Sequence, residues 1–370
     1  MRSYLLSFTL LVLSACFVTS SALGGGSTDV GGVSMDTDVI ISVDDPSGTN
    51  TTYDQNGNIV SGTNNVIKSF FEPTLASLAV VSSGGVSLLD DPPVEPGPST
   101  FATSSGGCSK YYSGSYIDTE GFSLLAGVAN GFQGYGILTL AAFFEGGWSE
   151  YETHNNFPTS IIRGNGEVEF YGGGIFTRYD LPSKLFAEAA FRIGWVGNEY
   201  SNNNILTASG NHFVKHDVSS TYYGGHLGLG YDWQLNQSSS LKFSNKFFFT
   251  HQGSSAENFE NTRYDFDSAD SFRWRIGGRY THNFQIGSRA TISPYAGVYF
   301  QYEFDGKSTG SINGAAFKDN PSLKGGHVIG EVGVFFKSSA DSRLTFGLSG
   351  QGYLGKREGI NGRLQLMYAF

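Results

Sequence analysis

The residues with the clearest chemical potential are charged side chains at every second position of otherwise apolar segments. In Phe272–Tyr280, the odd positions Arg273, Arg275 and Arg279 are cationic, while the even positions are aromatic, aliphatic or glycine. Successive side chains of a β-strand point to opposite faces, so this spacing predicts a strand with one charged face and one apolar face. The chemistry available to such a charged face is pairing with opposite charges, with a polar partner or with water.

Motifs for catalysis and metal binding are absent from the sequence. It has no Gly-x-Ser-x-Gly elbow, no His-Glu-x-x-His zinc helix and no phosphate-cradling glycine motif after a strand. Its seven His are scattered without ligand spacing. The segment Tyr53–Ile59 resembles a calcium loop, but Ile59 stands where Gly is needed and Asn65 where Glu is needed. We therefore predict neither an enzyme nor a cofactor or metal site, and interpret Asn56-Gly57 as a hairpin turn.

The composition indicates the kind of fold that carries these alternating faces. Charged residues make up 15% of the 370 residues and aromatic residues another 15%, with 51 Gly. About a quarter of a soluble protein is usually charged. Mean hydropathy is nevertheless only −0.17. The longest apolar run after the leader, Ile137–Phe144, is too short for a membrane-spanning helix. Together these values are typical of a transmembrane β-barrel, in which lipid-facing and water-facing residues alternate.

From Ser99 onward the sequence contains twelve strand-like segments. The alternation is clearest in Leu138–Trp148, Phe272–Tyr280, Ile292–Phe304, Val328–Phe336, Leu344–Gly350 and the terminal Gly359–Phe370. A soluble sandwich or barrel would also alternate. However, the polar faces are rich in glycine and mixed in size, and Trp and Tyr lie at segment ends, as at a membrane interface. Because no sheet edge can persist in hydrocarbon, we predict a closed all-β transmembrane barrel of twelve antiparallel up-and-down strands, in which the first strand pairs with the last.

The connections between the predicted strands alternate in length. The long, polar connections are Ser149–Asn165, Gly197–Ser219, Gly253–Ser268 and Asp305–Gly325. The short connections are Gly131–Gly134, Asp180–Lys184, Gln234–Ser240, Gln285–Arg289 and Ser338–Ser342. In outer-membrane barrels the periplasmic turns are short and the external loops long, so this alternation predicts which end faces outward.

The first 22 residues have the features of an export signal. Arg2 precedes the apolar segment Tyr4–Leu13, and small residues follow. Two processing sites remain open. Ser20-Ser21-Ala22 suits an ordinary signal peptidase, whereas Leu13-Ser14-Ala15-Cys16 resembles a lipobox in which Cys16 would be lipidated. With only two Cys in the chain, no disulfide framework is expected.

The region between the leader and the strands has two parts. Leu23–Asn65 is rich in Gly, Ser, Thr, Asn and Asp and has no Lys or Arg, so it cannot bury enough surface to fold alone. The next segment, Val66–Ser83, favours a helix, which we expect to be regular from about Pro73 to Ser82 because proline suits a first turn. A Pro-rich linker follows. Residues 23–98 hold ten acids and one base, which argues against binding to nucleic acid.

Several stretches resemble the translocator domain of autotransporters, the type V secretion proteins of Gram-negative bacteria, in that family's order and spacing. These stretches are Phe70–Ser82, Gly121–Gly127, Tyr179–Gly194, Tyr222–Leu229, Pro294–Gly306 and Gly350–Phe370. The resemblance covers roughly residues 66–370. It implies a twelve-stranded barrel in the outer membrane with one α-helix, Phe70–Ser82, threaded through its pore.

The resemblance also assigns roles to particular residues. The pore would be lined by the charged face of the strands, at Glu145, Glu188, Arg192, Arg273, Arg275, Arg279, Glu331, Arg343 and Arg363. Tyr368 and Phe370 resemble the family's carboxyl-terminal signal, which the barrel-assembly machinery reads. Besides that machinery, the implied partners are periplasmic chaperones and outer-membrane lipid, and the protein is expected to be a monomer.

One feature departs from the family. Autotransporter passengers are usually long β-solenoids, whereas only Leu23–Asn65 precedes the helix here, too little for stacked repeats. Some members cleave the passenger at an Asn-Asn pair, and Asn64-Asn65 is a weak candidate. The predicted divisions are a signal peptide at 1–22, a short passenger at 23–65, the pore helix and linker at 66–98 and the barrel at 99–370. The predicted function is export of the front segment to the cell surface. The alternatives are a plugged porin-like channel and a surface adhesin acting through its external loops.

Overall fold

A computed structural model of the chain describes residues 63–84, 95–156, 161–206, 212–259, 262–287, 290–312, 314–316, 321–338 and 343–370. The predicted export signal with Cys16, and the acidic segment as far as residue 62 with the turn predicted at Asn56-Gly57, lie outside the described residues. Within the part of the chain that is described, no helix is both long and apolar enough to cross a membrane.

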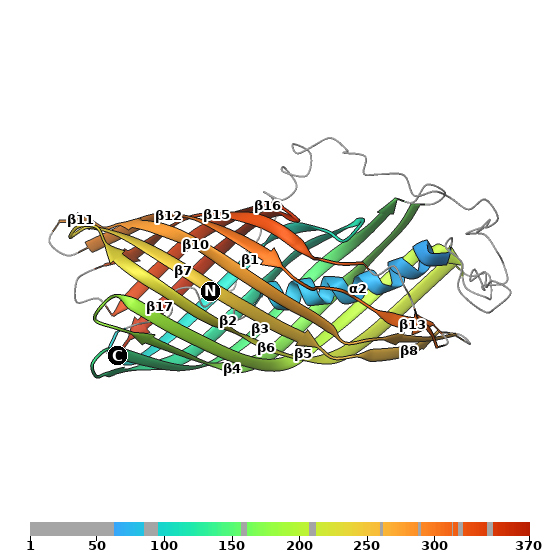
Figure 1. Cartoon of the computed structure of the whole chain (residues 1–370), viewed down its shortest axis with the longest axis horizontal. Coiled ribbons are helices and arrows are strands. Elements are labelled where there is room, and N and C mark those ends of the chain that lie inside the picture. The colour runs from blue at the N-terminus through green and yellow to red at the C-terminus, as the bar shows by residue number, and fades with distance from the viewer. Residues whose placement is uncertain are drawn as a thin grey trace.

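Twelve long strands form one closed antiparallel barrel (Figure 1). They are β1 (Gly97–Tyr112), β2 (Tyr116–Gln133), β3 (Ile137–Asn156), β4 (Ile161–Asp180), β5 (Leu185–Leu206), β6 (His212–Gln234), β7 (Ser239–Gln252), β10 (Ala269–His282), β12 (Ala290–Glu303), β15 (Gly325–Lys337), β16 (Leu344–Gly355) and β17 (Arg357–Ala369). Each strand pairs with the next, and β17 pairs with β1 from Ser99↔Ala369 to Tyr111↔Arg357. A short strand, β11 (Phe284–Ile286), extends the pairing at the start of β12. The predicted strand number and closure are confirmed.

The two faces of the barrel wall differ as the alternation predicts. Large apolar side chains project outward, and Leu227, Val298 and Phe144 keep 67%, 64% and 59% of their surface exposed. The intervening positions are buried and mostly polar. Such an outward apolar surface would be costly in water and is the surface that lipid covers.

The connections at one end of the barrel are short, as predicted, but the long connections are mostly strand rather than loop. β3 and β4 are paired as far as Asn156↔Ile161, and β5 and β6 as far as Leu206↔His212. The polar outer positions of these segments hide their strand character, because beyond the apolar band the large side chains, such as Tyr151 and Tyr200, lie on the inner face. The barrel wall therefore continues well past the membrane-facing band at this external end.

The two remaining long connections build a second, smaller sheet. Its strands are β8 (Ser255–Phe259), β9 (Thr262–Phe266), β13 (Gly310–Ile312) and β14 (Ala315–Ala316), in the order β14-β13-β9-β8. Phe266 of β9 contacts Phe71 of the helix edge to face, with ring centroids 5.5 Å apart. This sheet therefore packs against the helix from the external end of the barrel.

A single described helix, α2 (Thr63–Ser83), runs inside the barrel (Figure 1). It begins ten residues before Pro73, so the prediction of a regular helix only from Pro73 is wrong, and Asn64-Asn65 lie in its first turn rather than upstream of it. Proline removes a backbone donor and usually breaks a helix in water. Here the wall supports the helix at that point, because Asn198 Nδ2 donates to the Pro73 carbonyl oxygen at 2.6 Å.

The core of the protein lies between α2 and the wall. The predicted apolar face of Leu75, Leu78 and Ala79 is buried, but so are Phe71, Glu72 and Ala76 on its other sides. A helix buried all round is one enclosed by protein. The wall residues that pack on it are Tyr151, Val168, Phe170, Val196, Tyr200 and Tyr222.

Gly310 in β13 is expected to tolerate no side chain. A Cβ atom there would lie 2.2 Å from the Asp265 carbonyl oxygen and 2.4 Å from the Phe71 ring. Since neither group can move freely, Gly310→Ala should loosen the second sheet from α2, at a cost of about 1–3 kcal/mol. Trypsin cleavage of the folded protein at the exposed Arg263 should become several times faster. Gly330→Ala is the matched control, because a Cβ there meets nothing within 4 Å; equal rates for the two variants would contradict the expectation.

Candidate functional site in the barrel interior

A buried ion pair and its hydrogen bonds join the carboxyl-terminal end of α2 to four strands, β3, β5, β6 and β7. The Arg192 guanidinium on β5 donates from Nη1 to Glu145 Oε1 at 3.2 Å, and from Nη2 to the Val81 carbonyl oxygen and to Thr250 Oγ1, both at 3.0 Å. The Tyr222 hydroxyl donates to Glu145 Oε1 at 2.7 Å. Arg192 and Glu145 are both fully buried. A buried charge is stable only when paired and hydrogen-bonded, and this network meets that condition.

A second arginine, Arg273 on β10, also contacts the end of the helix. Its Nη2 donates to the Ser82 carbonyl oxygen. The last carbonyl groups of a helix have no partner within it and carry the negative end of the helix dipole, which cations stabilise. Arg192 and Arg273 together therefore act as a cap supplied by the wall.

Uncharged polar residues hold the preceding part of the helix. The buried Glu72 accepts hydrogen bonds from Asn155 Nδ2 at 2.6 Å and from Ser113 Oγ at 3.1 Å. Ser77 and Gln252 are hydrogen-bonded to each other, at 2.8 and 3.0 Å. Sequence reasoning missed these wall residues, because Asn, Ser and Gln on a strand carry no charge to mark them as interior.

Toward the end with the short connections, a second buried cluster surrounds Glu188. Its carboxylate lies 2.5 Å from Lys246 Nζ, 3.2 Å from His226 Nε2 and 3.5 Å from Arg178 Nη1. Arg178 also pairs with Asp180 at 2.6 Å. Only Glu188 belongs to the predicted set. Arg178 and Lys246 could have been found, since each lies on the same alternate positions of its strand as the other interior residues.

The other predicted pore residues differ in where they lie. Arg279 is buried with its guanidinium 4.6 Å from the centre of the Tyr295 ring. Glu331 is buried and accepts hydrogen bonds from Gln351 Nε2 at 3.3 Å and Tyr299 at 3.4 Å. Arg363 is buried, and Arg275 is half-buried beside Gln301, which accepts from its Nε at 2.9 Å. Arg343 is the exception.

The pore-facing position predicted for Arg343 stays a prediction. The residue precedes the first residue of β16, Leu344, and its side chain is exposed at the short-turn end. Leu344 faces outward opposite Tyr368, so alternation still assigns Arg343 to the inner side, at the rim of the barrel. Beside it, at the same end of the hairpin, Tyr368 and Phe370 pack edge to face on the outer surface, 39% and 62% exposed, and the Ala369 backbone nitrogen donates to the Arg343 carbonyl oxygen at 2.8 Å.

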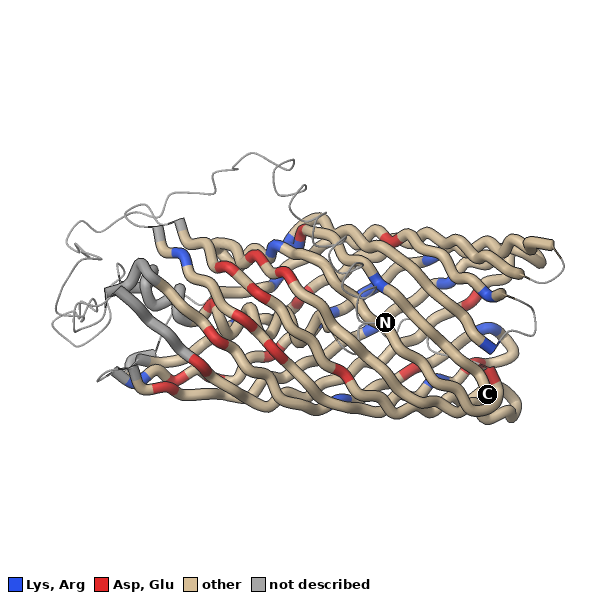
Figure 2. Tube along the Cα trace, turned by 180° about the vertical axis from the view of Figure 1, so that it is seen from behind, with Lys and Arg blue, Asp and Glu red and all other residues tan. Residues whose placement is uncertain are grey.

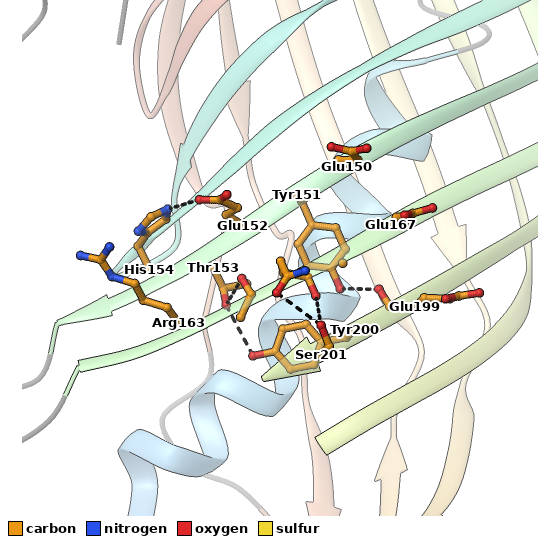
Figure 3. Close-up of a pocket in the computed structure, with 13 residues that line it drawn as sticks. Glu150, Tyr151, Glu152, Thr153, His154, Arg163, Glu167, Glu199, Tyr200 and Ser201 are labelled. Carbon is orange, nitrogen blue, oxygen red and sulfur yellow. Dashed lines mark hydrogen bonds and ion pairs between the residues drawn. The ribbon is translucent and has the colours of Figure 1, made fainter. Parts of the chain in front are cut away.

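The external end carries a hollow of about 840 Å³ over β3, β4 and β5 (Figure 3). A row of carboxylates crosses neighbouring strands at this level, through the directly opposed pairs Glu120↔Glu150, Glu150↔Glu167, Glu167↔Glu199 and Glu199↔Asp217. Figure 2 shows acidic residues gathered toward this end. Like charges placed directly opposite each other destabilise a sheet. Burial and the neighbouring Glu150 carboxylate accordingly raise the pKa of Glu120.

Neutralising one member of this row is expected to stabilise the protein. Glu150→Gln removes repulsion with both Glu120 and Glu167, which should add about 0.2–1 kcal/mol to the free energy of unfolding. A raised carboxyl pKa costs stability where the group is charged, so the gain should be full at neutral pH and vanish as the pH falls through the pKa of Glu120. Urea unfolding midpoints in detergent at several pH values test this. Glu169→Gln is the control and should give no gain, because the exposed Glu169 lies opposite Trp148 and Gly197 rather than opposite another acid.

Comparison with known proteins agrees with this architecture. A family model described as the autotransporter beta-domain matches residues 112–351. The beta domain of the Bordetella autotransporter BrkA has a TM-score of 0.59 at 14% identity, covering 74% of this chain and 99% of that one. The transport unit of AIDA-I from Escherichia coli has a TM-score of 0.59 at 16% identity, covering 80% of this chain and 99% of that one. The translocator domain of NalP from Neisseria meningitidis has a TM-score of 0.55 at 13% identity, covering 84% of this chain and 98% of that one. No curated protein sequence matches the chain.

A closed barrel with an apolar outer band and a helix held in a polar interior defines an outer-membrane translocator of type V secretion. The family match covers well over half of the sequence, and the chain belongs to the autotransporter beta-domain family. The barrels of this family are transport domains of the outer membrane of Gram-negative bacteria.

Proposed function

We propose that the barrel carries the chain's own front segment, residues 23–62, across the outer membrane to the cell surface and retains α2 as a plug. The observation that carries this proposal is the direction of α2. Its Glu72 is held by Asn155, one residue from the external end of β3, and its Phe71 packs on Phe266 of the external sheet. Its other end leads toward Glu95, which pairs with Lys337 at 3.3 Å at the short-turn end.

This direction supports an external position for the segment before the helix. A chain that enters α2 from outside must have its preceding residues outside, because the closed wall leaves no lateral exit. A porin-like channel that exports nothing would need no such polarity in its plug. The wall residues that bind Val81, Ser82 and Pro73 carbonyl oxygens support a helix that stays in place after transit.

Protease treatment of intact cells tests the proposal. An epitope inserted within residues 23–62 should be removed by external protease, as should one inserted between β8 and β9, which serves as the control for the external end. An epitope in the turn between β2 and β3 should survive until the outer membrane is broken. A front epitope that survives as well would overturn export.

Planar-bilayer recording separates export from a working channel. Because α2 fills the interior, the full chain should conduct little, and a chain lacking residues 1–83 should conduct several times more. Large, steady conductance from the full chain would favour the porin-like alternative.

A further inference from the structure

The interior wall carries more positive than negative charge. The inward-facing, buried or half-buried cations are Arg178, Arg192, Lys242, Lys246, Arg273, Arg275, Arg279, Lys337, Arg357 and Arg363. The carboxylates in the same positions are Glu145, Asp180, Glu188, Asp232, Glu303 and Glu331. Among the described residues the wall therefore holds ten cations against six carboxylates, and a low-dielectric wall focuses that surplus into the passage.

Four of the ten cations lie around the end of α2, in a group that we call the arginine belt: Arg192, Arg273, Arg275 and Arg357. Arg192 and Arg273 bind the Val81 and Ser82 carbonyl oxygens. Arg357 and Arg273 both line a cavity of about 30 Å³ beside Ser82. Arg273 and Arg275 lie over the same ring, that of Phe248, at 5.3 and 4.9 Å.

Two carboxylates lie close to the belt, and each is engaged. Glu145 binds Arg192 and Tyr222. Glu303 accepts hydrogen bonds from Ser271 Oγ at 2.6 Å and from the Phe272 backbone nitrogen at 2.8 Å. With α2 in place, its terminal carbonyl groups supply negative dipole to the belt. Another stretch of chain at this level would meet the same guanidinium groups without that dipole.

The segment that precedes α2 has complementary charge. Residues 23–65 contain Asp29, Asp36, Asp38, Asp44, Asp45 and Asp54, and no Lys, Arg or His. An extended chain rises about 3.3 Å per residue, so about nine residues span the hydrocarbon thickness of roughly 30 Å. The widest gap between these aspartates, from Asp45 to Asp54, is no longer than that span. While residues 29–54 pass, the passage would therefore always contain at least one carboxylate.

We propose that the arginine belt is an electrostatic guide for the acidic front segment, favouring passage of carboxylate-bearing chain and opposing cationic chain. This rests on the proposed export of that segment and names the charge class of its cargo. Arginine suits the binding of a passing carboxylate because each guanidinium offers several fixed donors, and a half-buried guanidinium keeps its positive charge.

Charge changes in the front segment of the full chain test the guide. One variant replaces all six aspartates by Asn and another replaces them by Lys, each with the epitope that reports external protease access. The Lys variant should expose the epitope about tenfold less than the unaltered chain, because focused charge changes local concentration by at least that factor. The Asn variant should fall in between. Heat-modifiable migration in gels confirms that each barrel is folded in the outer membrane.

A charge exchange in the wall separates guidance from other effects of lysine. Arg275→Glu with Arg357→Glu reverses two belt charges that do not bind helix carbonyl groups, and it should restore exposure of the Lys variant while lowering exposure of the unaltered segment. A Lys variant exposed as well as the unaltered segment, or not restored by this exchange, overturns the guide alone. An unaltered segment that is never exposed overturns export and the guide together.

Discussion

Replacing Arg192 with methionine is expected to lower the free energy of unfolding by about 3–5 kcal/mol, because it removes one partner of a buried ion pair. Glu145 would keep the Tyr222 hydroxyl, but its charge would stay fully buried without the guanidinium. The Val81 carbonyl oxygen and Thr250 would each lose a hydrogen bond as well. Urea unfolding in detergent measures the loss. Single-channel recording should show openings that the unaltered chain lacks, since the end of α2 is released.

A double variant tests whether the cost comes from the stranded carboxylate. Arg192→Met with Glu145→Gln leaves no unpaired charge, and replacing both partners of a buried pair is far milder than removing one. The double variant should recover most of the lost stability while still opening the channel. If the double variant is as unstable as Arg192→Met, the pair is not the source of the effect.

The outline of the fold could be predicted from the sequence because lipid imposes a strict period of two. The outward position of Val298 follows from that period. The inward position of Glu145, Arg192 and Arg273 follows from the same rule. Closure follows too, because an unpaired edge strand in hydrocarbon would leave its backbone groups without partners.

The external end and the helix could not be predicted in the same way. Beyond the apolar band the outer face of β3 to β6 is polar, while large side chains such as Tyr151 and Tyr200 lie on the inner face, so the outward apolar alternation that reveals a membrane strand is lost. The start of α2 was misplaced because Pro73 ends helices in water, whereas Asn198 from the wall supports the backbone there. That support comes from a residue 125 positions away in the sequence. The assembly role of Tyr368 and Phe370 and the lipidation of Cys16 stay predictions.

The lipid-facing surface gives the second large effect. Val298 lies on the outer face midway along β12 and is 64% exposed, between Gly278 and Gly330 on the neighbouring strands. Arginine at this depth must desolvate its charge in hydrocarbon or distort the bilayer, so Val298→Arg should lower the free energy of unfolding from lipid vesicles by about 2–4 kcal/mol. Reversible urea titration in vesicles, followed by tryptophan fluorescence, measures this difference.

The cost must depend on depth if lipid is its cause. Glu199→Arg places the same side chain on the outer face of β5 at the external end, beside Glu167 and Asp217. There the guanidinium stays in water and lies between two carboxylates, so the variant should match or slightly exceed the unaltered stability. If the whole outer face met water instead of lipid, both arginines would lie in the same solvent and their effects on stability would not differ with depth. Equal losses for the two arginines would place the Val298 face in water and would remove the physical basis for a membrane-spanning wall.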